Sequence, residues 1–238
     1  ESDAHAEALA LCDKRYQQRG LYWTHAARLG AELALRLEQL PLASAMYAAV
    51  LADKAVPWAK LGLARVLQAD GQAAAAVSTI RNLLDDEPKY ADAYDVMGRI
   101  HAEQGDLAGA IAAYRQAVEI TPFSVARAQK YGILAWYAAE PDVAHAALEH
   151  AASIGGDSPQ FDHQTLLLLA MARFQRGDAA GLRQCQKQLD GVLSRQTRGP
   201  DGDAVADNRL DRLRRLGRMT QALVAVQAQD RLGLQACL

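Results

Sequence analysis

Apolar residues recur at steps of three and four along most of the 238-residue chain, which is the spacing of helices with one apolar face. The clearest stretch covers residues 91–122, where Tyr94 and Met97 belong to one stripe and Tyr114 belongs to a second. Gly105-Asp106 lies between the stripes, and glycine suits a helix end with positive φ while aspartate caps the next helix. The pattern predicts two antiparallel helices joined by a turn.

The same pattern returns along the chain. Small residues recur 34 positions apart, at Ala64, Gly98 and Gly132 and again at Ala76, Ala110 and Ala144. Helices that pack ridge into groove lie only about 8–10 Å apart, so small residues are expected where they approach most closely. One helix pair cannot bury its own stripe, and we therefore expect successive pairs to stack.

Residues 91–122 resemble the tetratricopeptide repeat, whose pattern is W-x₂-L-G-x₂-Y, then A-x₃-F, then P. The resemblance rests on Tyr94, Met97, Gly98, His101, Ala110, Tyr114 and Pro122. It implies an all-α superhelix, or solenoid, of about five helix pairs with a C-terminal capping helix. A protein of this family is expected to work as a protein-interaction scaffold.

Three segments follow from the phase of the repeat. Residues 1–56 hold an N-terminal helix at 4–18 and a degenerate pair, residues 57–193 hold the repeat array, and residues 194–238 hold a loop and a last helix. A four-residue insertion falls in the glycine-rich stretch 155–159, and a second loop is expected at 194–202. We expect the last helix to cover the final apolar stripe, with docking of a partner or a second copy as the alternative.

Composition narrows the class of protein. Half of the residues are hydrophobic but only 6% are aromatic, which favours helices and excludes an all-β fold. A net charge of −2 argues against binding of nucleic acid mainly through phosphate contacts. No segment reaches the roughly 20 apolar residues that cross a bilayer, so no membrane partner is expected. Cys12, Cys185 and Cys237 are scattered, which favours a cytoplasmic protein without disulfides.

A narrower resemblance extends over residues 4–189. The segments PWAKLGLAR (57–65), YADAYD (90–95) and TPFSVAR (121–127) look like the repeat part of bacterial response regulators that join a CheY-like receiver to tetratricopeptide repeats. This resemblance implies two-component signalling and a phosphorylatable receiver upstream. Independently, the sequence starts Glu1-Ser2-Asp3 without Met or a signal region, so we expect it to be a fragment. No phosphoacceptor can be assigned within residues 1–238.

No catalytic, cofactor-binding or metal-binding residue is predicted. The six histidines form no ligand motif, because His145 and His150 are five residues apart and face different sides of a helix. His101 occupies the consensus Tyr position and is expected to pack with a satisfied ring nitrogen. Glycine-rich phosphate loops and nucleophile motifs are absent from the sequence, so we expect no enzyme.

The remaining chemistry is recognition of a protein or peptide in the concave groove. The resemblance places groove-facing residues at the second, fifth, sixth, ninth, twelfth and thirteenth positions of each repeat. The expected groove residues are Trp58, Arg65, Gln68, Asp92, Asp95, Arg99, Glu103, Gln129, Lys130, Trp136 and Tyr137. Core packing remains the alternative for Trp136 and Tyr137, of which one must leave the core.

The last helix supplies two rival hypotheses. Five arginines lie within ten residues of this helix, which would suit a regulator that contacts nucleic acid. They are Arg209, Arg212, Arg214, Arg215 and Arg218. Interleaved acidic residues favour a salt-bridged helix instead. The other rival is a structural module that self-associates through this helix, so that a homodimer stays open.

Overall fold

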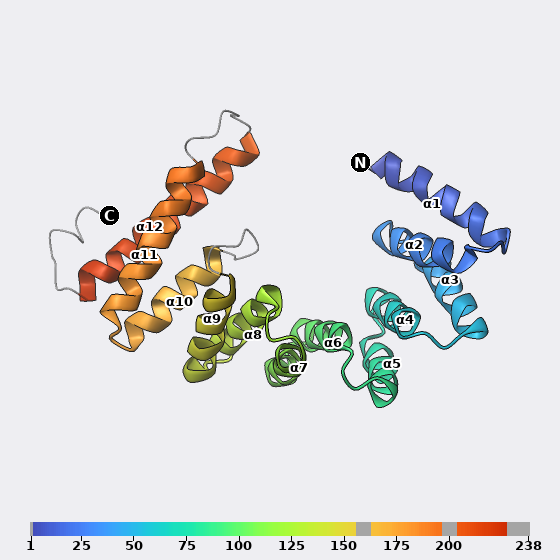
Figure 1. Ribbon diagram of the computed structural model, residues 1–238, viewed down its shortest axis with the longest axis horizontal. Helices are drawn as coiled ribbons and strands as arrows, with labels where there is room; N and C mark the ends of the chain where they lie inside the picture. Colours follow the sequence, from blue (N-terminus) through green and yellow to red (C-terminus); the bar gives the residue numbers. More distant parts are fainter. Residues whose placement is uncertain (1, 156–162, 197–203, 228–238) are drawn as a thin grey trace. The chain divides into compact units, whose positions relative to one another are not determined.

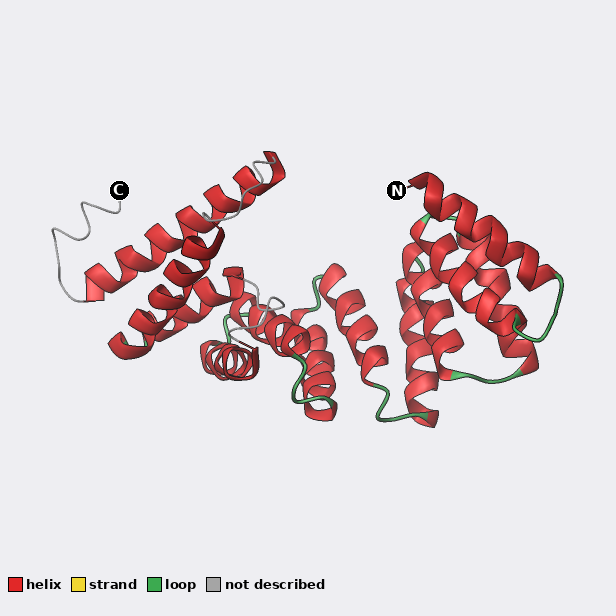
Figure 2. Ribbon diagram, turned by 45° about the horizontal axis from the view of Figure 1, so that its top comes forward, coloured by secondary structure: helices red, strands yellow, loops and turns green. Residues whose placement is uncertain are grey.

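The structure is a computed structural model that describes residues 2–155, 163–196 and 204–227. Within those residues it consists of twelve helices and contains no strand (Figures 1 and 2). The all-α fold predicted from composition and periodicity is confirmed.

The chain forms two compact units, Glu1–Ile120 and Thr121–Leu238, here called unit 1 and unit 2. Unit 1 contains α1 (Ser2–Gln17), α2 (Trp23–Arg36), α3 (Leu40–Asp53), α4 (Pro57–Ala69), α5 (Ala73–Asp86), α6 (Ala91–Glu103) and α7 (Leu107–Ile120). Unit 2 contains α8 (Val125–Tyr137), α9 (Pro141–Gly155), α10 (His163–Gln175), α11 (Ala179–Gln196) and α12 (Ala204–Gln227). The division falls inside the segment 57–193 that the repeat phase defines.

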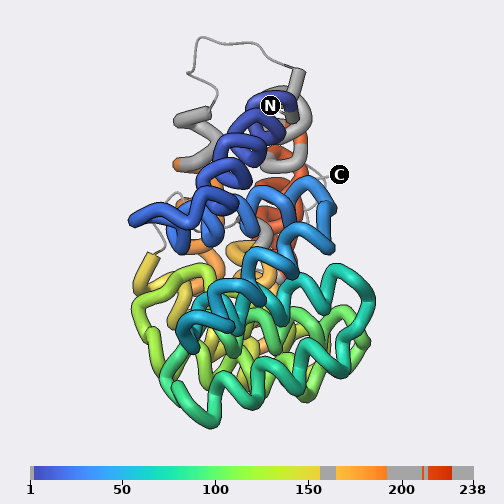
Figure 3. The backbone as a smooth tube through the Cα atoms, turned by 90° about the vertical axis from the view of Figure 1, so that its right-hand side faces the viewer, coloured from blue at the N-terminus to red at the C-terminus, as the bar shows by residue number. Residues whose placement is uncertain are grey.

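Consecutive helices pack as pairs, and the chain runs back and forth through them (Figure 3). The pairs are α2–α3, α4–α5 and α6–α7 in unit 1, and α8–α9 and α10–α11 in unit 2. Five pairs were predicted, and the helix α1 lies close to the expected range 4–18. The insertion expected at 155–159 falls mostly outside the described residues, since α9 ends at Gly155 and α10 begins at His163.

Small residues on the first helix of a pair let the second helix approach closely. A Cβ added at Gly98 of α6 would lie 2.6 Å from Cε2 of Tyr114 in α7, far inside van der Waals contact. At the equivalent Gly132 of α8, it would lie 2.8 Å from Cδ2 of Leu148 in α9. The 34-residue spacing of small residues therefore reports close helix approaches, as the sequence indicated.

The turn of the α6–α7 pair also follows the sequence prediction. Gly105 has a φ of 77°, in the left-handed region. Asp106 Oδ1 accepts a hydrogen bond of 2.9 Å from the backbone N–H of Gly109, which caps α7. His101 Nδ1 lies 2.8 Å from Asp106 Oδ2, so the packed ring with a satisfied nitrogen is confirmed.

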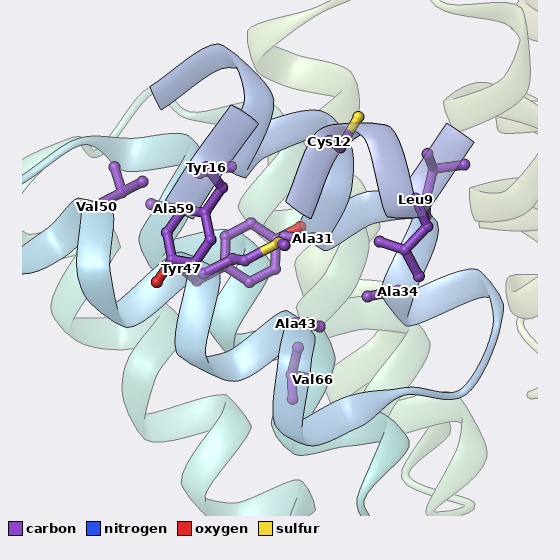
Figure 4. Close-up of a cluster of buried hydrophobic side chains, with 13 residues drawn as sticks. Leu9, Cys12, Tyr16, Ala31, Ala34, Ala43, Tyr47, Val50, Ala59 and Val66 are labelled. Carbon is purple, nitrogen blue, oxygen red and sulfur yellow. The ribbon is translucent and has the colours of Figure 1, made fainter. Parts of the chain in front are cut away.

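Buried apolar side chains form continuous cores within each unit. In unit 1 one cluster joins α1 to α4 and includes Met46 and Tyr47, both fully buried. Figure 4 shows Tyr47 within this cluster, close to Tyr16 and Ala59. A second cluster joins α4, α5 and α6 around Ile80 and Ile100. In unit 2 one cluster joins α8, α9, α10 and α11, and it includes the fully buried Leu169. Within each unit, successive helix pairs thus bury apolar side chains against each other.

The last helix covers the end of unit 2. Leu216, Leu223 and Val224 of α12 pack against the unit 2 core, and α12 contacts α10 and α11. The predicted capping role agrees with this packing. The prediction of a loop from residue 194 is wrong at its start, because α11 continues to Gln196. Arginine and glutamine are good helix formers and extend α11 by a turn. The rest of that loop, 197–203, lies outside the described residues.

Candidate functional site

A cavity of about 690 Å³ opens between the first helices of three successive pairs in unit 1. Helices α2, α4 and α6, the turn after α2 and the first residue of α3 contribute its walls. The lining residues, here called the inner groove, are Leu35, Arg36, Glu38, Leu40, Arg65, Gln68, Ala69, Arg99 and Glu103. Four of them, Arg65, Gln68, Arg99 and Glu103, are predicted groove residues.

An ion pair joins α2 to α4 beside the groove. Arg65 Nη1 donates hydrogen bonds to both carboxylate oxygens of Glu32, at 2.6 and 2.8 Å. The hydroxyl of Tyr47 donates a third bond of 3.0 Å to the same carboxylate. Burial of Tyr47 and the negative charge of Glu32 raise the pKa of this phenol above its usual value. The Glu32 carboxylate is thereby held between a cation and a neutral donor.

A second polar chain joins α4 to α6. Arg99 Nη2 donates to Gln68 Oε1 at 2.9 Å, and Gln68 Nε2 donates to Glu103 Oε2 at 2.6 Å. Because Arg65 and Arg99 are 34 residues apart, successive repeats supply equivalent guanidinium groups to the groove. Arg99 and Glu103 are exposed, so their pair contributes little to stability and stays accessible to a ligand, whereas Arg65 and Gln68 are half-buried.

Three other predicted residues of unit 1 do not line the cavity. The Trp58 ring meets that of Tyr47 edge to face, with 6.2 Å between centroids, and Arg28 lies 5.2 Å above Trp58. Trp58 therefore belongs to the packing between α3 and α4. Asp92 is exposed on α6, and Asp95 is half-buried on the same helix.

The predicted residues of α8 lie in unit 2. Gln129 is only 5% exposed, and its amide donates a 3.1 Å hydrogen bond to Thr165 Oγ1 in α10. Trp136 packs against the unit 2 core, whereas Tyr137 is 61% exposed. Gln129 and Trp136 therefore present little surface to a ligand, because neighbouring helices already cover them. Lys130 and Tyr137 are exposed.

Sequence reasoning missed the contribution of α2 to the groove. Leu35, Arg36, Glu38 and Leu40 come from the pair that was classed as degenerate. The signal was present, because Leu35, Ala69 and Glu103 are spaced by 34 residues and all line the cavity. The first pair departs from the repeat consensus, and for that reason no groove residue was predicted in it.

The arginine-rich last helix is partly paired. Arg214 Nη1 lies 3.1 Å from Asp211 Oδ1, as expected for a salt-bridged helix, and Arg215 and Arg218 are exposed. The side chains of Arg209 and Arg212 lie outside the described residues. Among the described residues, no three His, Cys, Asp or Glu side chains gather as a metal site. None of the described helices is both long and apolar enough to cross a bilayer.

Antiparallel helix pairs that stack at a 34-residue spacing define a helical-repeat protein. The family model of the tetratricopeptide repeat matches residues 61–125, which reach from α4 to the start of α8. Residues 61–125 thus match the tetratricopeptide repeat, and the helices of the chain have the fold of proteins built from such repeats. A comparison with curated proteins gives no match.

Solved structures support this fold at low sequence identity. The C-terminal part of a TPR repeat-containing protein from Cytophaga hutchinsonii is 15% identical with a TM-score of 0.69, covering 98% of this chain and 88% of its own. BtubC from P. vanneervenii is 14% identical with a TM-score of 0.63, and the match covers 85% of this chain and 93% of BtubC. YrrB, described as a TPR protein with an unusual peptide-binding site, is 14% identical with a TM-score of 0.59. The match covers 79% of this chain and 86% of YrrB.

Proposed function

We propose that the inner groove of unit 1 binds a segment of a partner protein, and that the chain acts through binding and not through catalysis. The observation that carries this proposal is the cavity of about 690 Å³ between α2, α4 and α6. Tetratricopeptide repeat proteins generally mediate protein–protein interactions, and YrrB is described as having a peptide-binding site.

The groove has the chemistry that peptide binding requires. Leu35, Leu40 and Ala69 offer apolar contact area, while Gln68, Arg99 and Glu103 present hydrogen-bonding groups beside them. The bonds from Gln68 to Arg99 and Glu103 restrict these side chains before a ligand arrives. Such pre-organisation lowers the entropy cost of binding. We therefore expect an extended or helical peptide with both polar and apolar side chains.

Selection from a displayed peptide library tests the proposal. The whole chain is immobilised, peptides are selected, and their affinities are measured by fluorescence anisotropy. Arg99→Ala should weaken the selected peptides about tenfold or more, the effect of losing an important interface arginine.

Arg115→Ala is the matched control. Arg115 pairs with Glu119 four residues on, at 4.0 Å, just as Arg99 pairs with Glu103 at 4.0 Å, but it lies on α7 outside the groove. Its substitution should leave affinity unchanged. Failure to select any peptide, or equal losses in both variants, contradicts the proposal.

The narrower role as the output part of a response regulator rests on sequence resemblance alone. Under that hypothesis an upstream receiver alters access to the groove. Sequencing the complete gene provides the test, because a reading frame that encodes no receiver rejects this role and leaves the binding proposal intact. A cytoplasmic location likewise stays a prediction.

A further inference from the structure

The turn between α1 and α2 carries two protruding apolar side chains. Leu21 is 87% exposed and Tyr22 is 68% exposed, and the loop that bears them projects at the right-hand edge of Figure 2. Neither lines the inner groove. Large apolar side chains exposed next to each other on a protein surface mark interaction sites more often than scattered ones do.

Contacts of Arg19 with two aromatic rings stabilise this turn. Arg19 adopts a positive φ of 50°, and its guanidinium carbon lies 4.1 Å from the centroid of the Trp23 ring and 5.0 Å from that of Tyr16. The Tyr16 side chain is buried in the unit 1 core. Because Arg19 is stacked on both aromatic rings, the following residues Leu21 and Tyr22 are held outside the core.

Basic residues predominate in the sequence next to these apolar side chains. No aspartate or glutamate occurs between Lys14 and Ala31, although the whole chain has a net charge of −2. Lys14, Arg15 and Arg19 are exposed and form no ion pair with any residue that the structure describes. By contrast, Lys60, Arg65 and Arg99 are paired with carboxylates.

We propose that Lys14, Arg15, Arg19, Leu21 and Tyr22, here called the α1–α2 tip, dock onto the surface of an anionic lipid bilayer. Exposed apolar side chains beside exposed basic ones match a surface that offers anionic phosphates over an apolar interior, as an anionic bilayer does. Leu21 enters the boundary between headgroups and acyl chains, and Tyr22 places its ring at that boundary with its hydroxyl toward water. The basic residues contact lipid phosphates.

This inference revises the expectation of no membrane partner. That expectation rested on the lack of a spanning segment, and attachment to one surface needs none. The tip is also separate from the inner groove, so peptide binding and membrane docking can succeed or fail independently.

Sedimentation of the whole chain with vesicles tests the proposal. One vesicle preparation contains phosphatidylglycerol and phosphatidylcholine in equal parts, and the other contains phosphatidylcholine alone. The chain should sediment with the anionic vesicles only, and rising salt should release it because salt screens the attraction. Lys14→Gln with Arg15→Gln should lower the partition coefficient about twentyfold, and Leu21→Ser with Tyr22→Ser about tenfold.

Two matched controls accompany the tip variants. Phe123→Ser removes an apolar side chain that is 84% exposed elsewhere, and Arg183→Gln with Lys187→Gln removes two exposed charges from α11. Both controls should bind anionic vesicles like the unchanged chain. All these side chains are exposed, and circular dichroism should show an unaltered helix content.

Several results overturn the proposal. They are the absence of sedimentation with anionic vesicles, equal sedimentation with neutral vesicles, and equal losses in the controls and the tip variants. A further one is that the unchanged chain binds a single-stranded oligonucleotide but no vesicles, and that the tip variants lose this oligonucleotide binding. That last result would assign the tip to nucleic acid.

Discussion

Five residues with positive φ occupy equivalent turns within the helix pairs. Gly71, Gly105 and Gly177 adopt φ values of 78°, 77° and 72°, which glycine tolerates without strain. Ala139 and Glu38 occupy the corresponding turns at 57° and 58°, although each carries a Cβ. For an L-residue this conformation costs about 1 kcal/mol. The helix pairs impose the turn, and these two residues adopt it at a cost.

Replacing Ala139 by glycine should therefore stabilise the protein. We expect Ala139→Gly to raise the free energy of unfolding by about 1 kcal/mol, because it removes the Cβ strain. Urea denaturation followed by circular dichroism measures the change.

Gly105→Ala is the reverse control. An added Cβ at Gly105 meets nothing within 4 Å, so only the backbone conformation is affected. Gly105→Ala should lower the free energy of unfolding by about 1 kcal/mol. If Ala139→Gly lowers the stability, the assigned strain is absent.

At the scale of helices, an ionic network locks α9, α10 and α11 together. Arg173 of α10 donates to both carboxylate oxygens of Glu149 in α9, at 2.6 and 2.8 Å. Its Nη1 also donates to the Gly181 carbonyl at 2.7 Å and to Cys185 Sγ at 3.1 Å. Burial raises the pKa of the Cys185 thiol to about 11, so the sulfur stays a neutral acceptor. Three helices thus share one buried guanidinium.

Arg173→Met should destabilise unit 2 by about 3 kcal/mol, because it removes the buried cation and leaves the Glu149 carboxylate only its 3.4 Å contact with His145. Adding Glu149→Leu should recover a large part of the loss, since apolar pairs often replace buried ion pairs at little cost. Urea denaturation of both variants compares these values. If the double variant is less stable than Arg173→Met alone, the carboxylate was not the source of the loss.

The sequence predicted the helix cap of this arrangement but not its ion pair. His101, Asp106 and Gly109 of the α6–α7 pair correspond to Arg173, Asp178 and Gly181 of the α10–α11 pair, and both aspartates cap the following helix. The cap at Asp106 was predicted from its position after Gly105. The Arg173–Glu149 pair was not, because residues 24 positions apart meet only after α9 and α10 pack.

At the scale of the whole molecule, each unit has its own buried cores. The clusters of unit 1 use residues from α1 to α6, and the cavity of the inner groove lies entirely within that unit. Repeat proteins derive their stability from each repeat and its nearest neighbours. A part of the array that retains these neighbours is therefore expected to fold.

Residues 1–120 produced alone should form a helical, cooperatively unfolding protein. The fragment should bind the peptides selected on the whole chain with unchanged affinity, because every lining residue is retained. Thermal denaturation by circular dichroism and fluorescence anisotropy give the two measurements. A folded fragment that has lost peptide affinity would show that the peptides bind outside the inner groove.

The sequence by itself determined the helices, their pairing and the turns. Apolar spacing, small residues and glycines act within about 34 positions of one another, so they can be found without coordinates. It also named four groove residues, Arg65, Gln68, Arg99 and Glu103, through their repeat positions. Tertiary structure alone decided that α2 completes the groove, that Gln129 and Trp136 are covered, and that Leu21 and Tyr22 protrude. Burial depends on which helices pack together, and a repeat position does not specify its neighbours.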